Sequence, residues 1–235
     1  MKAILVRVGI DHSAGEWNAP VDTKTGEFVY VPIPETPEWV LPGQGRPYLE
    51  VVPALKRMSV SLPDHLLKES MHLDPDFKTL TYGDMPRRGA PLKTMQRGDV
   101  LAFYAGLRSL SDDSGLVYAL IGVFFVDEVL MAENVPAARR DENAHTRRPD
   151  PTGEIIVRAQ KGLSGRLTRC LPIGERRDNA YRVRRDLLAE WGGMSVKDGF
   201  IQRSGTLPSF LHPDKFCHWL GEQHVALIAA NNQEP

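Results

Sequence analysis

The sequence predicts an α+β fold, in which a single domain spanning residues 1–235 is built on a mixed central β-sheet with short helices and long Pro-rich loops. Three apolar runs, at 2–10, 100–107 and 116–129, are rich in aliphatic, β-branched and aromatic residues, as expected of buried strands. Eighteen prolines are spread through the chain and disfavour long helices. A hydrophobic content of 42% and a charged content of 25% in 235 residues are typical of one globular domain.

The N-terminal part is predicted to contain two strands around a polar loop, followed by a long loop. Residues 11–20 carry acidic, hydroxyl, indole and amide groups after the first strand, and residues 28–33 return as a second apolar run. Six prolines interrupt residues 34–63, which predicts an extended, packed loop with at most one helical turn. Trp39 and Tyr48 are expected to pin this loop to the body of the protein.

The central part carries the strongest strand signals. An aspartate at the start of 64–70 predicts a short capped helix, and turn-forming residues make 72–98 irregular. The apolar runs at 100–107 and 116–129 are separated by a polar turn at 109–115. Together they predict a hairpin of central strands.

Beyond residue 130 the predicted elements are short. In chain order they are a helix at 133–140, a strand at 154–159, helical turns at 186–191, a helix at 213–222, and a strand or helix at 224–229. Residues 231–235 are polar and predict a frayed tail.

Composition points to a cytoplasmic protein. Cys170 and Cys217 are the only cysteines, which excludes a disulfide scaffold and a cysteine-rich zinc site and fits a reducing compartment. The apolar run near 116–126 is too short and too β-branched for a membrane helix. Arg7 interrupts the first apolar stretch, so no signal peptide is expected.

Positive charge is concentrated between residues 139 and 185. This stretch holds thirteen Lys and Arg against six acidic residues, a net charge of +7 within a chain of net charge −1. Arginine suits bidentate phosphate contacts, and Lys161-Gly162-Leu163-Ser164-Gly165-Arg166 has the glycines and hydroxyl of a phosphate-binding turn. The predicted phosphate-binding residues are Arg139, Arg140, Arg147, Arg148, Lys161, Ser164 and Arg166. The alternative is a solvated arginine-rich surface.

The loop after the first strand carries the first candidate site. Cleavage of an N-glycosidic bond passes through an oxocarbenium-like state, which a carboxylate such as Asp11 can stabilise. Ser13 and Asn18 could bond the edge of a flipped base, and Trp17 could stack on it. The alternative is an ordinary turn formed by Asp11, with Trp17 as a core residue.

Later segments supply further candidates. Tyr82 and Asp84 lie on a glycine turn and could recognise a base or share in catalysis, while Tyr104 could line the same site or simply fill the core. Glu142, Asn143 and His145 within the arginine-rich stretch form a plausible acid–base set or a set that binds the edge of a base, with Asn143 and His145 as the predicted base-binding residues.

A metal site is weighed and set aside. His72, Asp74 and Asp76 are close in sequence, but Asp-Pro-Asp is common in turns and no further histidine is nearby. No metal or other cofactor is therefore predicted. The chain also lacks the motifs of serine hydrolases, zinc proteases, dinucleotide oxidoreductases and zinc deaminases.

Several blocks, taken together, match a family pattern. They are Gly9-Ile10-Asp11-x-Ser13-x-Gly15-x-Trp17-Asn18-Ala19-Pro20-Val21, Gly26-x-Phe28-Val29-Tyr30-Val31-Pro32-Ile33-Pro34-Glu35, His72-x-Asp74-Pro75-x-Phe77, Thr81-Tyr82-Gly83-Asp84, Gly98-Asp99-x-x-x-Phe103-Tyr104-Ala105-Gly106-Leu107, and Tyr118-x-x-Ile121-Gly122. The pattern, which extends to about residue 169, resembles the third nucleotide-modification-associated domain family. The resemblance implies an association with enzymes that make, read or remove modified DNA bases, including in conflict with phages.

The leading hypothesis is a DNA glycosylase that excises a flipped, hypermodified base, plausibly in antiviral defence. Asp11 and Asp84 would be catalytic, DNA the partner, and no protein partner or membrane is predicted. The first alternative is a non-catalytic reader, because residues 97–104 and 121–123 are similar to the sheet of PUA-like domains. A transferase that writes the modification is a further alternative, although the chain has no donor-binding motif.

Overall fold

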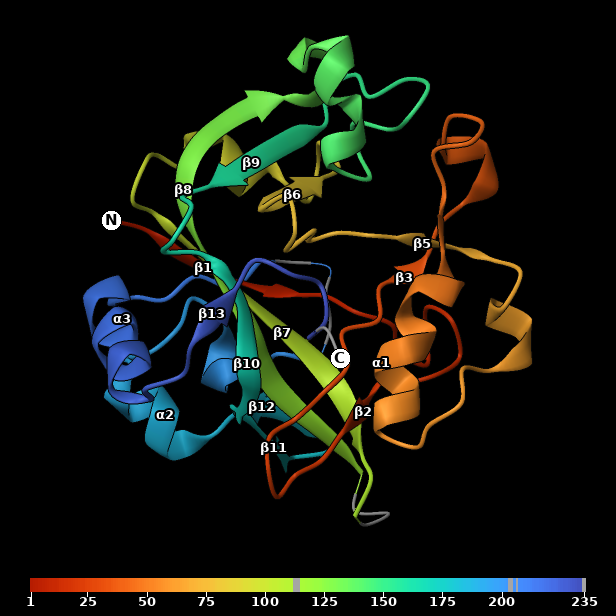
Figure 1. Cartoon of the computed structure of the whole chain (residues 1–235). Coiled ribbons are helices and arrows are strands. Elements are labelled where there is room, and N and C mark those ends of the chain that lie inside the picture. Colours follow the sequence, from red (N-terminus) through yellow and green to blue (C-terminus); the bar gives the residue numbers. More distant parts are fainter. Residues whose placement is uncertain (112–114, 203–204, 206, 234–235) are drawn as a thin grey trace.

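The computed structural model describes residues 1–111, 115–202, 205 and 207–233, and it is built around an eight-stranded mixed sheet (Figure 1). The main path through the sheet is β1 (Ala3–Arg7), β7 (Val100–Ser109), β8 (Leu116–Met131), β10 (Gly165–Pro172) and β13 (Leu227–Ile228). Off this path, β2 (Pro20–Val21) pairs with β7, and β9 (Ile155–Ala159) pairs with β8 and with β6 (Thr81–Asp84). The predicted fold class is confirmed.

The sheet is mixed because β7 pairs in parallel with the N-terminal strand β1 and antiparallel with β8. β1 runs parallel to β7, with Ala3 opposite Val100 and Arg7 opposite Tyr104. β7 and β8 are antiparallel, which confirms the predicted central hairpin. Part of the predicted turn at 109–115, residues 112–114, lies outside the described residues.

The long strand β8 divides the sheet into two parts. One end pairs with β10 and the other pairs with β9, and the register shifts in both pairings. Gly122 lies in the part that pairs with β10, and a Cβ there would lie 2.3 Å from Cε1 of Phe77. The aromatic ring therefore packs directly on the backbone of β8, and β9 carries β6 away from the main path toward the C-terminal end of β1 (Figure 1).

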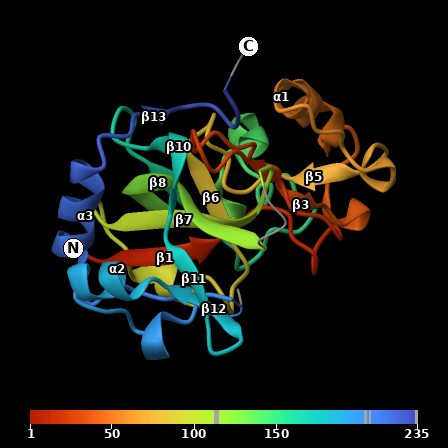
Figure 2. The same ribbon diagram turned by 90° about the horizontal axis from the view of Figure 1, so that it is seen from below.

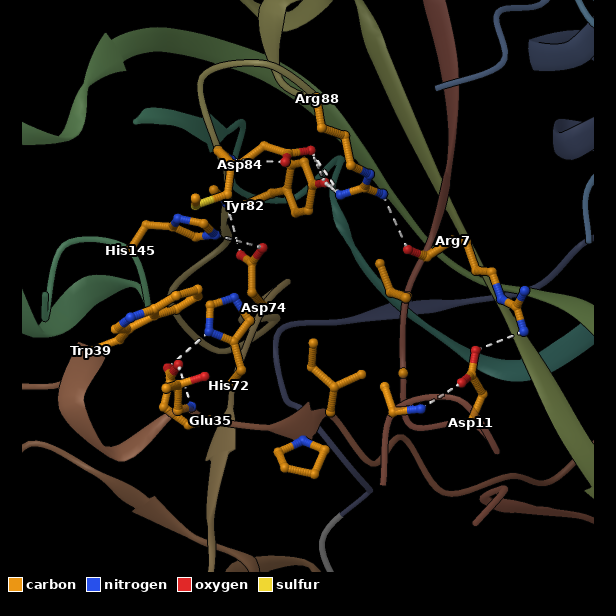
Figure 3. A pocket seen from close by; sticks show the side chains of 18 of the residues that line it. Arg7, Asp11, Glu35, Trp39, His72, Asp74, Tyr82, Asp84, Arg88 and His145 are labelled. Carbon is orange, nitrogen blue, oxygen red and sulfur yellow. Dashed lines mark hydrogen bonds and ion pairs between the residues drawn. The ribbon is translucent and has the colours of Figure 1, made fainter. Parts of the chain in front are cut away.

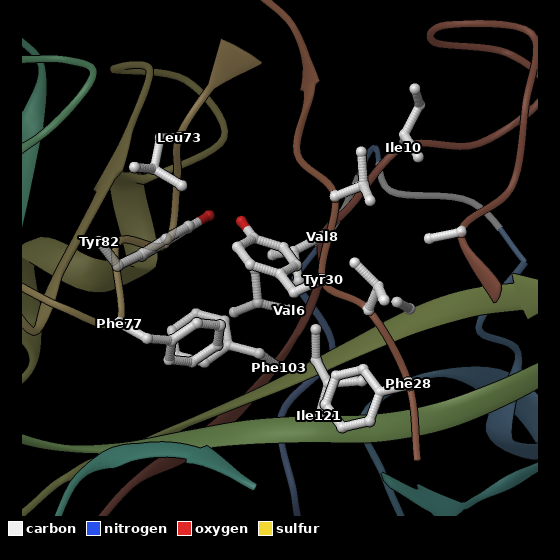
Figure 4. Close-up of a cluster of buried hydrophobic side chains, with 14 of the residues drawn as sticks. Val6, Val8, Ile10, Phe28, Tyr30, Leu73, Phe77, Tyr82, Phe103 and Ile121 are labelled. Atoms are coloured by element: carbon white, nitrogen blue, oxygen red, sulfur yellow. The ribbon is translucent and has the colours of Figure 1, made fainter. Parts of the chain in front are cut away.

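Two apolar cores cover the two faces of the sheet. The first contains a chain of edge-to-face rings, in which Phe77 lies 5.3 Å from Tyr30 and 5.8 Å from Phe103 between ring centres (Figure 4). The second packs Trp191 and Phe216, 5.5 Å apart, under α2 (Arg185–Glu190) and α3 (Pro213–Glu222). Figure 2 shows α2 and α3 on one side of the sheet and the segment with α1 (Val52–Arg57) on the other.

The predicted loop at 34–63 is more structured than expected. It contains η1 (Pro37–Trp39), η2 (Tyr48–Val51) and α1, and η2 continues directly into α1, so the limit of one helical turn was wrong. Pro53 lies in the first turn of α1, where a proline costs no hydrogen bond. Tyr48 is buried as predicted, with its hydroxyl donating to the Pro32 carbonyl oxygen, whereas Trp39 is 46% exposed and does not enter a core.

Small elements complete the chain. A second sheet has the order β3 (Ile33–Pro34), β5 (Ser70–His72), β4 (Arg46–Pro47), and a hairpin joins β11 (Gly174–Arg177) to β12 (Ala180–Val183). The remaining 3-10 helices are η3 (Asp64–Leu66), η4 (Ala90–Thr94), η5 (Ala132–Asn134), η6 (Ala137–Glu142) and η7 (Lys197–Gly199). Only Ile33 of the predicted strand at 28–33 is in a regular strand, because the backbone of Tyr30 bonds a side chain instead of a neighbouring strand.

The predicted frayed tail is instead tied to the first core. The Asn231 side chain bonds the backbone N–H of Phe77 and the carboxylate of Asp76, and Asn232 bonds both backbone groups of Tyr30. The prediction was wrong for residues 231–233, and residues 234–235 lie outside the described part of the chain. Among the described residues there is no helix of the length and apolarity that a membrane span requires.

Candidate active-site pocket

One cavity of about 340 Å³ lies where β1 ends, where β6 leaves the main sheet, and where the segment 143–148 crosses over it (Figure 3). Its volume is at the small end of the range for ligand pockets. Its polar lining comes from segments far apart in the sequence, namely Asp11, Glu35, His72, Asp74, Tyr82, Asp84, Arg88, His145 and Arg148. Trp39 stands at its edge.

Strand β6 brings Tyr82 and Asp84 together with Arg88. Oδ2 of Asp84 accepts a hydrogen bond from the Tyr82 hydroxyl at 2.7 Å. The same oxygen forms an ion pair with Nη1 of Arg88 at 2.8 Å. Oδ1 accepts the backbone N–H of Met85 at 2.8 Å. Burial raises the pKa of Asp84 and outweighs the opposing effect of Arg88. The three side chains form a rigid wall in which a carboxylate, a phenol and a guanidinium are fixed by one another.

Two histidines lie side by side next to β6, and His145 packs against Gly83. The rings of His72 and His145 meet edge to face, with centres 4.9 Å apart. Nδ1 of His72 bonds Oε2 of Glu35 at 2.8 Å, and Nδ1 of His145 bonds Oε2 of Glu154 at 2.6 Å. Burial, followed by the proximity of His72 and Arg148, lowers the pKa of His145 well below its ordinary value.

Asp74 lies between the histidines and β6. Oδ1 accepts hydrogen bonds from the Gly83 backbone N–H and from Nδ2 of Asn143, each at 2.8 Å. Oδ2 lies 3.7 Å from Nε2 of His145 and accepts no hydrogen bond from any residue that the structure describes. Burial raises the pKa of Asp74 to about 7 against the opposing effect of His72. This carboxyl therefore has one oxygen anchored and the other available to a ligand.

Asp11 borders the pocket, but its carboxylate is engaged within the protein. Oδ1 accepts the backbone N–H and hydroxyl of Ser13 at 2.8 and 2.5 Å and the N–H of Ala14 at 3.0 Å. Oδ2 forms an ion pair with Nη2 of Arg7 at 2.8 Å. Asp11 therefore forms the ordinary turn that was the alternative to a catalytic role, and Arg7 pairs with it as well.

The outer edge of the pocket carries an arginine stacked on an indole. The guanidinium of Arg148 lies 4.7 Å above the ring of Trp39, and its Nη1 pairs with Oε1 of Glu154 at 2.5 Å. Arg148 itself is buried, whereas Trp39 is about half exposed. An exposed aromatic ring beside a polar cavity suits stacking on a planar ligand.

The structure brings some of the predicted site residues together and separates others. Asp11, Ser13, Tyr82, Asp84, His145 and Arg148 all border the pocket. Trp17 and Asn18 border a different hollow beside Arg108 and Ser109. Tyr104 is 1% exposed in the second core, where its hydroxyl donates to the Ile201 carbonyl oxygen, so the core interpretation holds. Asn143 is fully buried behind Asp74 and supports that carboxylate.

The arginine-rich stretch is not one exposed surface. Arg147 and Arg166 are each 1% exposed and bond backbone carbonyl oxygens, so neither reaches a phosphate in this conformation. Ser164 is also buried, where its hydroxyl accepts the N–H of Phe125. Arg139, Arg140 and Lys161 are exposed, and Arg139 is also paired with Glu142.

The sequence did not predict the cluster of His72, Asp74 and His145. The candidate metal site that was set aside consisted of His72, Asp74 and Asp76. His72 and Asp74 do lie together, but the third member of the cluster is His145 and not Asp76. Asp76 instead caps a turn through the N–H groups of Lys78 and Thr79. The β6–β9 pairing brings the segment before β9 over the pocket, and no spacing in the sequence signals this. Arg88 and Glu154 were not predicted as site residues, and Glu35 entered only as the last residue of a block that matches the family pattern.

The fold and the pocket define an α+β protein with a half-open cavity, lined by several charged side chains, at a strand end. The family model described as nucleotide modification associated domain 3 matches residues 2–200, and the chain therefore belongs to that family. The predicted resemblance is confirmed, and a role associated with nucleotide modification follows from it. No curated protein and no solved structure matches the chain.

Proposed function

We propose that the protein is a hydrolase that excises a modified base from DNA by cleaving its N-glycosidic bond and leaving an abasic site. The family supports a nucleic-acid partner. The observation that carries the proposal is that Asp74 and Asp84 line one cavity that has an exposed Trp39 at its edge. A base turned out of the DNA would stack on the indole and reach the carboxylates.

The chemistry requires negative charge near the sugar and an oriented water molecule. When the C1′–N bond breaks, its electron pair leaves with the base and positive charge develops on the sugar. Water then adds its oxygen to C1′ and gives a proton to a carboxylate, and that proton passes on to the departed base, leaving the neutral base and an abasic site. In the proposed arrangement Asp74 orients the water through Oδ2, and Asp84, fixed by Tyr82 and Arg88, stabilises the developing charge.

This assignment moves the leading role from Asp11 to Asp74. Both oxygens of Asp11 are held by Arg7 and by the turn at Ser13, so Asp11 shapes the edge of the pocket. Arg139 and Arg140 on η6, and Lys161, remain the proposed phosphate contacts because they are exposed.

The test uses DNA that contains hypermodified cytosine and matched unmodified DNA, each in single- and double-stranded form. Released bases are measured by mass spectrometry and abasic sites by alkaline cleavage. The wild-type protein should release the modified base, and Asp74→Asn and Asp84→Asn should each lower the rate by about 10²-fold or more while DNA binding persists. Asp64→Asn is the matched control, because Asp64 is exposed on η3 outside the pocket.

The second candidate function is a non-catalytic reader of modified bases. It is supported by two ion pairs, Asp11 with Arg7 and Asp84 with Arg88, which already occupy these carboxylates. A rigid, fully hydrogen-bonded wall suits recognition without turnover. Tighter binding to modified than to unmodified DNA, without release of a base, would favour the reader and refute excision of that base.

A further inference from the structure

We infer that His72, Asp74 and His145 form a binding site for one divalent transition-metal ion in the wall of the pocket. One ligand atom from each residue lies within 4.8 Å of the other two. Ligands bound at about 2.0–2.2 Å to one ion lie roughly 3–4 Å apart, so a closing movement of about 1 Å completes the site. Two imidazoles and a carboxylate are the donor set of many catalytic zinc and iron centres.

The histidines are oriented as metal ligands usually are. Nδ1 of each histidine forms a hydrogen bond with a buried carboxyl group. The partner of His72 is Glu35, and the partner of His145 is Glu154. This arrangement leaves Nε2 of each ring as the ligand atom, and carboxylate–histidine–metal chains of this kind fix the ring in metal sites. Nε2 of His145 already faces Oδ2 of Asp74 at 3.7 Å, and Figure 3 shows the three side chains converging.

The acidic surroundings of the two histidines are a second argument from geometry. Four carboxyl groups lie in this cluster against two guanidinium groups, namely Glu35, Asp74, Asp84 and Glu154 with Arg88 and Arg148. An excess of carboxyl groups around two imidazoles in a partly buried site favours the binding of a cation.

The donor set and its exposure define the class of ion. Imidazole ligands favour Zn²⁺ or Fe²⁺ over Mg²⁺ and Ca²⁺, which prefer oxygen. All three ligands border the cavity, so coordination positions remain open toward a substrate. An ion with an open position can polarise a bound group or lower the pKa of water. The inference stands on these residues alone; if base excision also occurs, the ion would lie where the attacking water must be oriented.

The experiment measures metal binding directly, apart from any activity. Protein stripped with a chelator is titrated with Zn²⁺, with Fe²⁺ or Mn²⁺ under anaerobic conditions, and with Mg²⁺, and bound metal is counted by mass spectrometry. At least one transition ion should bind with one equivalent per chain and raise Tm by roughly 5–10 °C at hundredfold excess over Kd. His72→Gln and Asp74→Asn should weaken binding by at least 10²-fold.

The control is His65→Gln, because His65 is exposed and bonds the Gly15 carbonyl oxygen outside the cluster. If a ligand variant fails to fold, X-ray absorption of the zinc-loaded wild-type protein still tests the site, since two imidazole ligands are expected. Stripped protein that binds no ion at 1 mM, or ligand variants that bind as well as wild type, would overturn the inference. Metal bound without base release would refute excision and leave the metal site intact.

Discussion

Gly83→Ala should disturb the pocket without removing any functional group. Gly83 lies on β6 between Tyr82 and Asp84, and a Cβ there would be 2.4 Å from Cδ2 of His145 and 2.7 Å from Oδ1 of Asn143. Ordinary contacts begin near 3.4 Å, so the imidazole ring must move by about 1 Å. The ring cannot turn away cheaply, because Nδ1 of His145 is held by Glu154 at 2.6 Å.

The expected cost is that of an overpacked core. Inserting a methyl group into such a site destabilises by about 1–3 kcal/mol. For a chain of this size each kcal/mol lowers Tm by about 2–4 °C, so Tm should fall by roughly 2–12 °C. The backbone N–H of Gly83 also donates to Asp74, and any shift of β6 therefore displaces a second member of the cluster. Zinc affinity should fall by at least about tenfold.

The assay compares Tm by differential scanning fluorimetry and zinc affinity by calorimetry. Gly221→Ala is the matched control, because a Cβ at that position in α3 meets nothing within 4 Å, and it should leave both quantities unchanged or raise Tm slightly. A Gly83→Ala protein with wild-type Tm and wild-type zinc affinity would refute the packing of His145 against β6 on which the site depends.

Three further predictions test other parts of the structure. Trp39→Ala should weaken binding of modified DNA by about 1–3 kcal/mol with little change in Tm, measured by fluorescence anisotropy, because the ring is 46% exposed. Arg166→Ala should destabilise by about 3–5 kcal/mol in urea unfolding, because it leaves the Phe28 carbonyl unbonded and opens a cavity; a loss under about 1 kcal/mol would contradict this. Burial raises the pKa of Cys170 to about 12, so about one thiol in 10⁴ is ionised at pH 8. Ellman's reagent should therefore modify at most Cys217 in the native protein and both thiols after unfolding.

The central sheet was predictable because its strands carry their own signal. The runs at 100–107 and 116–129 are apolar on both faces, and they became β7 and β8 with boundaries shifted by two residues at most. β6 and β9 were harder, since β6 is four residues long and includes a buried aspartate, Asp84. Its hydrogen-bonding partner lies more than seventy residues away, and only the folded sheet supplies that pairing.

The charge count failed for a different physical reason. A net charge of +7 between residues 139 and 185 suggested an exposed phosphate-binding surface, which assumes that arginine lies in water. Here Arg147 and Arg166 bond backbone carbonyl oxygens in the interior, and Arg148 and Arg158 pair with the buried carboxylates of Glu154 and Glu142. Charge totals alone do not distinguish these two uses.

Several residues that break the usual burial pattern lie at or beside the pocket. Local rules put tryptophan inside and carboxylates outside, yet here Trp39 is exposed while Asp74 and Glu154 are buried. A sequence keeps such costly exceptions where they serve a site, because selection for stability alone would remove them. This argues for Asp74 and its two histidines, more than for the turn at Asp11, as the part of the protein that acts on its ligand.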